Sequence, residues 1–270
     1  MNFCSNLRRI ILLCGFGATV AGLARAAAAE PPVIVQPTDR VLVQRGFVPF
    51  AGRKRLYACA VGTPAGIHFA YDLATGAILY VWRGSFLDTT EMWQGRAFNQ
   101  TEKPVGTALA LGGKPLLAMF PEGSPLSRKL LEEPKTGAWP DDAETLYSSL
   151  GYDLEPNGLP VFRATLSELA VQDRIAPEAN GLGLTRSLTF SGPMPYWETW
   201  VLIAEADKIV PIPGSGFAIG NGEWWVGWPA ASALQPTILT FGSQQRLVVH
   251  LPRKSLAQPL VYSIEWTSSP

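Results

Sequence analysis

The sequence predicts an all-β fold, a large antiparallel β-sandwich with few short helices. Two observations predict this class. Short runs with alternating apolar residues recur at roughly 8–12-residue spacing, which is the rhythm of a sandwich or barrel. The chain also has 26 Gly and 23 Pro in 270 residues, enough to separate many strands by turns. Only 16% of the residues are charged, against about 25% in an average soluble domain, so a large apolar core is expected and disorder is not.

Residues 1–29 have the three parts of a signal peptide. Arg8 and Arg9 precede an apolar stretch at 10–23, and the small residues of 24–29 allow cleavage near Ala26 or Ala29. The apolar stretch has about 14 residues, whereas about 20 are needed to span a bilayer. We therefore expect a periplasmic or extracellular protein with no stable membrane span after leader removal. Retention of the leader as an anchor is the alternative.

After the leader, residues 30–40 predict an extended lead-in and residues 41–270 a single β-sandwich domain. A hairpin is expected over 67–83, with strands 67–73 and 77–83 joined by a three-residue loop that ends at Gly76. Alternation places Ile78, Tyr80 and Trp82 on one face of the second strand. Because both faces of that strand are apolar, it is predicted to lie in a layer buried between others.

A second hairpin is centred on Asn157-Gly158, a pair that favours the positive φ angles of a tight turn. A short helix or surface excursion is expected at 124–133. The last two predicted strands are expected to pair with one another and close the sheet. Further strands are predicted at 168–175, 184–190, 199–206, 237–241, 246–251 and 260–266.

Charge and cysteine content exclude several functions. From Glu30 onward the chain has 19 basic and 22 acidic residues, so the basic stripe of a nucleic-acid-binding protein is missing. The single basic run, 53–55, is expected in a solvated turn. Cys59 is the one cysteine beyond the leader and is predicted to be a small buried apolar residue. With two histidines, His68 and His250, and no phosphate-binding or haem-attachment motif, we expect no metal and no cofactor.

The segment 82–96 concentrates residues that bind carbohydrates. Indole rings stack on sugar rings, and Arg, Asp and Glu hydrogen-bond sugar hydroxyls. An anchored loop, with its aromatic residues in the core and Arg83 paired to Asp88, is the alternative. Asp88 and Glu91 would form an acid/base pair only if their carboxylates converged. The candidate ligand-binding residues are Trp82, Arg83, Asp88, Glu91, Trp93 and Arg96.

A second aromatic cluster lies at 224–228. In a strand, Trp224 and Trp228 share one face and Trp225 lies on the other, so the first two are candidates for a ligand-stacking surface. Core packing is the alternative interpretation. A similar cluster occurs at 195–200.

Residues 60–72 and 76–88, together with 151–154 and 158–162, resemble an uncharacterised β-sandwich domain of exported proteins from environmental bacteria. That domain often accompanies c-type cytochrome or sugar-oxidation modules. The order of hairpins is also loosely similar to galactose-mutarotase-like supersandwiches. The resemblance implies sugar binding or sugar processing. Since the chain has no CxxCH motif, it also implies that any redox role needs a separate exported partner.

Three functions are therefore expected. The first is an exported, non-catalytic binding or accessory module, with carbohydrate as the expected ligand. The second is a sugar-processing enzyme, such as a hydrolase, lyase or epimerase, which would use Asp88, Glu91, Arg96 and His68 in one cleft. The third is a scaffold that docks an exported redox protein.

Overall fold

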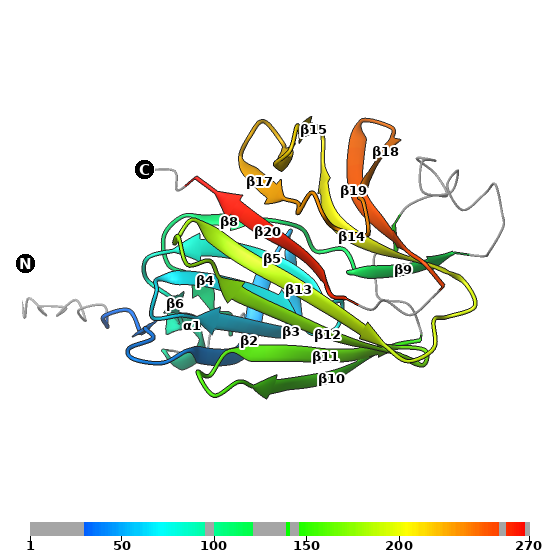
Figure 1. Cartoon of the computed structure of the whole chain (residues 1–270). Coiled ribbons are helices and arrows are strands. Elements are labelled where there is room, and N and C mark those ends of the chain that lie inside the picture. The colour runs from blue at the N-terminus through cyan, green and yellow to red at the C-terminus, as the bar shows by residue number, and fades with distance from the viewer. Residues whose placement is uncertain (1–29, 95–99, 121–138, 141–145, 254–257, 268–270) are drawn as a thin grey trace, which may run out of the picture. The chain divides into compact units, whose positions relative to one another are not determined.

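The computed structural model describes residues 30–94, 100–120, 139–140, 146–253 and 258–267 (Figure 1). Residues Pro32–Pro270 form one compact unit. The structure is nearly all β, with 58% strand and 2% helix in four antiparallel sheets, which confirms the predicted all-β sandwich. Within the described residues, the assigned helix is α1 (Thr90–Trp93).

The four sheets contain 20 strands among the described residues. The five-stranded sheet has the order β2 (Leu42–Phe50), β3 (Arg53–Gly62), β4 (Ile67–Asp72), β5 (Ala77–Arg83) and β8 (Ala108–Ala110). The eight-stranded sheet has the order β10 (Tyr147–Leu154), β11 (Pro160–Leu166), β12 (Leu169–Pro177), β13 (Gly183–Ser191), β20 (Leu260–Trp266), β17 (Trp224–Gly227), β16 (Gly216–Ile219) and β15 (Ile209–Ile212). The four-stranded sheet has the order β18 (Thr237–Phe241), β19 (Gln244–Leu251), β14 (Glu198–Ala206) and β9 (Leu117–Phe120), and β1 (Ile34–Val35), β6 (Leu87–Asp88) and β7 (Lys103–Pro104) form the smallest sheet.

The main hydrophobic core joins the three larger sheets. It combines inward-facing side chains of β3, β4 and β5 with those of the eight-stranded and four-stranded sheets. Alternation along each strand supplies these residues, as predicted for β4, where Ile67, Phe69 and Tyr71 all enter this core. The sheets therefore stack through one continuous apolar layer.

The five-stranded sheet is covered on its second face as well. A second core there contains Ala70, Leu79 and Trp82 together with Phe86 and Leu87 from the segment that follows β5. All six residues of β4 are consequently buried, and so are five of the seven residues of β5, the strand for which a layer between layers was predicted.

The predicted alternation in β5 is wrong beyond Ile78. A β-bulge shifts the pairing of β4 with β5 between Ala70 and Tyr71. The bulge inserts one extra residue, so Ile78 and Val81 enter the main core while Leu79 and Trp82 enter the second core.

The predicted closing pair, 246–251 with 260–266, is also wrong. β19 pairs with β14 and β18, whereas β20 lies between β13 and β17 of the eight-stranded sheet. These two strands follow one another in the sequence but belong to different sheets, as Figure 1 shows for β19 and β20.

The predicted lead-in at 30–40 forms backbone and side-chain hydrogen bonds with the rest of the fold. β1 pairs with β6, and the Gln36 side-chain oxygen accepts the backbone N–H of Phe86 at 3.0 Å. The predicted leader at 1–29 and the predicted helix at 124–133 lie outside the described residues. No helix in the described part of the chain is long and apolar enough to cross a membrane.

A buried carboxylate lies against β2. Glu102 is fully buried, and its backbone N–H donates to the Phe47 carbonyl at 2.9 Å. A Cβ at Gly46 would lie 2.3 Å from Glu102 Oε2, so the approach requires glycine. Neither carboxylate oxygen makes a hydrogen bond of good geometry with a described residue, although the Gln44 amide lies close enough to interact with the carboxylate. Burial raises the pKa of Glu102 to about 7, and the nearby Gln44 amide opposes this shift.

The raised pKa predicts a pH-dependent stability. Between the ordinary value of 4.5 and about 7, the folded state holds a proton that the unfolded chain has released. This contribution to stability is present at low pH and is lost as the pH rises through this window. We compare the free energy of unfolding in urea for Glu102→Gln and wild type. The difference, variant minus wild type, should be about 2 to 3 kcal/mol larger at pH 8 than at pH 5.

The exposed Glu168→Gln is the matched control and should show little change in the same comparison. An equal stability difference between Glu102→Gln and wild type at pH 5 and pH 8 would contradict the assignment.

Candidate functional site

Three of the predicted stacking residues belong to the core. Trp82 is fully buried, stacks on Phe86, and donates its indole N–H toward the Ser85 and Phe86 carbonyls. Trp224 and Trp228 are 4% and 7% exposed and pack in the main core. The prediction that these three residues form ligand-stacking surfaces is wrong. Each indole is packed inside one of the two cores, Trp82 in the second and Trp224 and Trp228 in the main core, so none offers a face to a ligand.

The charged residues predicted around this segment hold the chain in place. Arg83 lies over the Trp266 ring and donates to the Trp266 carbonyl at 2.9 Å and to the Leu182 carbonyl. Asp88 accepts the backbone N–H of Thr90 at 2.9 Å. Hydrogen bonds from Thr90 lower the pKa of Asp88, so this carboxylate is ionised at neutral pH.

Glu91 is held by Lys103, which begins β7, and by Thr101, two residues before it. It accepts hydrogen bonds from Lys103 and Thr101, and these two donors lower the pKa of Glu91. With both Asp88 and Glu91 ionised, neither carboxyl keeps the proton that a general acid must donate near neutral pH.

Trp93 is the predicted aromatic residue that the structure exposes, with 68% of its surface accessible. It ends α1, directly after Glu91 and Met92. Arg96, the last predicted residue of this segment, lies outside the described residues.

His68 has a structural role. Its Nδ1 accepts the backbone N–H of Thr63 at 3.2 Å, so the neutral ring donates from Nε2 to the Gly84 carbonyl at 2.8 Å. The ring is fully buried against Trp82 and Phe86, and burial lowers its pKa. Cys59 is likewise buried, and burial raises its pKa to about 12, as expected of an unreactive thiol. Among the described residues no group of His, Cys, Asp or Glu side chains could hold a metal ion.

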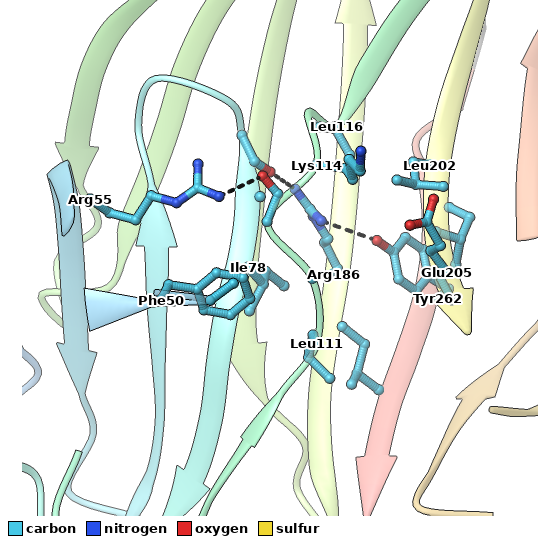
Figure 2. A pocket seen from close by; sticks show the side chains of 18 of the residues that line it. Phe50, Arg55, Ile78, Leu111, Lys114, Leu116, Arg186, Leu202, Glu205 and Tyr262 are labelled. Carbon is cyan, nitrogen blue, oxygen red and sulfur yellow. Dashed lines mark hydrogen bonds between the residues drawn. The ribbon is translucent and has the colours of Figure 1, made fainter. Parts of the chain in front are cut away.

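The clearest cavity lies where the three larger sheets meet. It has a volume of about 380 Å³, within the range of small-molecule sites. Figure 2 shows Arg55, Arg186 and Tyr262 around it, with Phe50 and Ile78 beside them. Its walls come from β2, β3, β5, β13, β14 and β20 and from the loop 111–116 that follows β8.

Arg186 is held firmly at the back of this pocket. Its Nε and Nη2 donate to the two carboxylate oxygens of Asp173 at 3.0 and 2.5 Å. Nη2 also donates to the Gly76 carbonyl at 2.6 Å, and Nη1 to the Tyr262 hydroxyl at 3.3 Å. Tyr71 donates to the same Asp173 carboxylate at 2.9 Å. Burial acts to lower the pKa of Arg186, but Asp173 outweighs this effect, and the pKa is raised.

Arg55 enters the pocket from β3 and is held more loosely. Its Nη1 lies 3.3 Å from Asp72, and its Nη2 donates to the Gly113 carbonyl at 3.2 Å. A Cβ at Gly113 would lie 2.4 Å from Arg55 Nη2 and 2.7 Å from the Phe50 ring. Glycine at 113 therefore gives the guanidinium its place in the pocket.

Sequence reasoning missed this site. Residues 53–55 were predicted to form a solvated basic turn, yet Arg53 and Arg55 line the pocket and Lys54 does not. Alternation along β3 was the available signal, since residues two apart share one face of a strand. Asp173 lies on the strand next to Arg186, but the other partners of Arg186, Gly76 and Tyr262, come from distant segments, as Gly113 does for Arg55.

Comparison with protein-family models, with curated proteins and with solved structures finds no match to this chain. The site is therefore interpreted from its own geometry.

The Arg186–Asp173 pair predicts a large loss of stability when one partner is neutralised. Both side chains are at most 5% exposed, so Asp173→Asn leaves a buried guanidinium without its counter-charge. We expect the free energy of unfolding to fall by about 3 to 5 kcal/mol.

Asp153→Asn breaks the exposed ion pair of Asp153 with Arg163 and is the matched control. Chemical denaturation should show a loss of no more than about 1 kcal/mol for this control. Similar losses for the two variants would contradict the assigned role of Asp173.

Proposed function

We propose that this chain is an exported, non-catalytic binding or accessory module, and that its ligand site is the pocket where the three larger sheets meet. The observation that carries this proposal is the combination of a cavity of about 380 Å³ with a polar side chain, Arg186, fixed by hydrogen bonds at its back. A rigid polar group beside apolar walls is typical of a small-molecule site.

The bonds of the predicted catalytic residues support the non-catalytic part of the proposal. Asp88, Glu91 and His68 are each engaged with neighbouring backbone or side-chain groups, and His68 is buried. A sugar-processing enzyme remains a prediction from the sequence. Docking of an exported redox protein also remains such a prediction.

Filling the pocket should abolish ligand binding. A ligand-observed NMR screen of sugars and organic acids identifies small molecules that bind the wild-type chain. Leu111→Trp places a larger side chain in the pocket wall, so these molecules should no longer bind the variant. Leu150→Trp changes an exposed leucine on β10 and should leave the same molecules bound.

Two results would contradict the pocket as the ligand site. One is a screen in which no molecule binds the wild-type chain. The other is unchanged affinity of the identified molecules for the Leu111→Trp variant.

Carbohydrate binding at α1 is the second candidate, and the exposure of Trp93 favours it. An exposed indole beside hydrogen-bonding carboxylates suits a sugar ring. If a glycan binds there, Trp93→Ala should weaken it roughly five- to tenfold in calorimetric titration, because stacking of about 1 to 1.5 kcal/mol is lost.

Trp197→Ala removes another exposed indole, on the segment before β14, and is the matched control. Equal glycan affinity for wild type and Trp93→Ala would remove this candidate while leaving the pocket proposal intact.

A further inference from the structure

The two guanidinium groups of the pocket differ in how fully their donors are used. Arg186 makes four hydrogen bonds, two of them to the oxygens of one carboxylate. Arg55 makes two bonds, of 3.2 and 3.3 Å, and its buried Nε has no partner among the described residues. Because a buried donor without a partner is costly, Arg55 is the group whose hydrogen bonding a ligand would complete.

The charge of the lining favours a negative ligand. Four cationic side chains line the pocket: Arg53, Arg55, Lys114 and Arg186. The carboxylate in the lining, Glu205, accepts a hydrogen bond from Arg246 at 2.6 Å, so its charge is already compensated. Behind the lining, Asp72 and Asp173 pair with Arg55 and Arg186. The lining itself carries four cationic side chains and one carboxylate, and this excess of cationic groups favours an anion over a neutral molecule.

Apolar side chains make up much of the remaining lining. Phe50 lies beside Arg55, with Ile78 next to it, and Leu202 lies on the opposite side of the pocket (Figure 2). Leu111 and Ile264 also line the pocket. Contact with these side chains favours a ligand whose body is hydrocarbon rather than a ring covered with hydroxyl groups.

We propose that the pocket takes a small organic carboxylate with a short apolar body, and that Arg55 binds its negative charge. This inference rests on the pocket being the ligand site. The planar guanidinium matches a carboxylate in geometry and can offer two parallel N–H donors to it. Arg186 acts as a positioning residue, since its bonds hold the turn at Gly76 beside the site.

Calorimetric titration of the full chain with hexanoate and with hexanamide tests the proposal. The two molecules have nearly the same size and differ in charge. We expect hexanoate to bind at least about tenfold more tightly, because a hydrogen bond to a charged group is stronger than a neutral one. Arg55→Met should weaken hexanoate roughly ten- to hundredfold and leave hexanamide unchanged.

Lys54→Met is the matched control, since it removes the neighbouring positive charge from a side chain that does not line the pocket. It should change the affinity for hexanoate by no more than about twofold, because salt screens the long-range effect of the Lys54 charge. Gly113→Ala is a second test, because its methyl group displaces the Arg55 guanidinium while keeping the arginine. This variant should also lose hexanoate selectively, even if Arg55→Met fails to fold.

Equal affinity of wild type for hexanoate and hexanamide would overturn the carboxylate assignment and leave the pocket as the ligand site. Unchanged hexanoate binding in both Arg55→Met and Gly113→Ala would overturn the role of Arg55. Tighter binding of glucuronate than of hexanoate would overturn the apolar body. If neither hexanoate nor any other small molecule binds, the proposed function fails together with this inference.

Discussion

The arrangement of the sheets around the pocket depends on one buried ion pair. Asp173 on β12 and Arg186 on β13 belong to the eight-stranded sheet, whereas Tyr71 on β4 and the Gly76 carbonyl belong to the five-stranded sheet. A buried charge is tolerated only when it is paired and hydrogen-bonded. These polar groups can therefore be buried only when the two sheets bring them into contact. The pair thus fixes where the two sheets contact one another at the edge of the main core.

The same pair determines what the pocket can do. Since Arg186 is fully engaged, it contributes a rigid wall and little free hydrogen-bonding capacity. Arg55, on the facing sheet, is placed by its ion pair with Asp72, by the Gly113 carbonyl and by contact with Phe50, and its Nε has no partner among the described residues. One guanidinium therefore supports the fold, and the other is the group that we propose binds the ligand. Burial raises the pKa of Tyr262, so its hydroxyl stays protonated beside them.

The strands were predictable because their signals are local. Alternation and glycine turns indicated β4, β5 and most later strands, since each pattern lies within a few residues. The bulge in β5 was not predictable, because the extra residue is defined only by pairing with β4. The pairing of β19 and β20 also failed as a prediction. Neighbours in sequence often pair, but here each strand completes a different sheet.

The candidate site was harder to predict than the fold. The sequence predicted a ligand-binding role for Trp82, Trp224 and Trp228 because they lie in aromatic clusters. Large cores also need aromatic side chains, and these three residues are buried. Arg186 lies 110 residues from Gly76, and Arg55 lies 58 residues from Gly113, so these contacts depend on the completed topology. Sequence patterns report which face a residue takes, and they do not report which distant residue faces it.

The most direct measurement is NMR detection of the arginine Nε–H groups during a titration with a small carboxylate. Our account predicts that the Arg186 Nε–H exchanges slowly with water and keeps its chemical shift, because Asp173 holds it. The Arg55 Nε–H should exchange faster in the free protein, then shift and become protected as the carboxylate binds. A shift confined to Arg186, or an Arg55 signal that is protected from the start and does not change, would contradict the account.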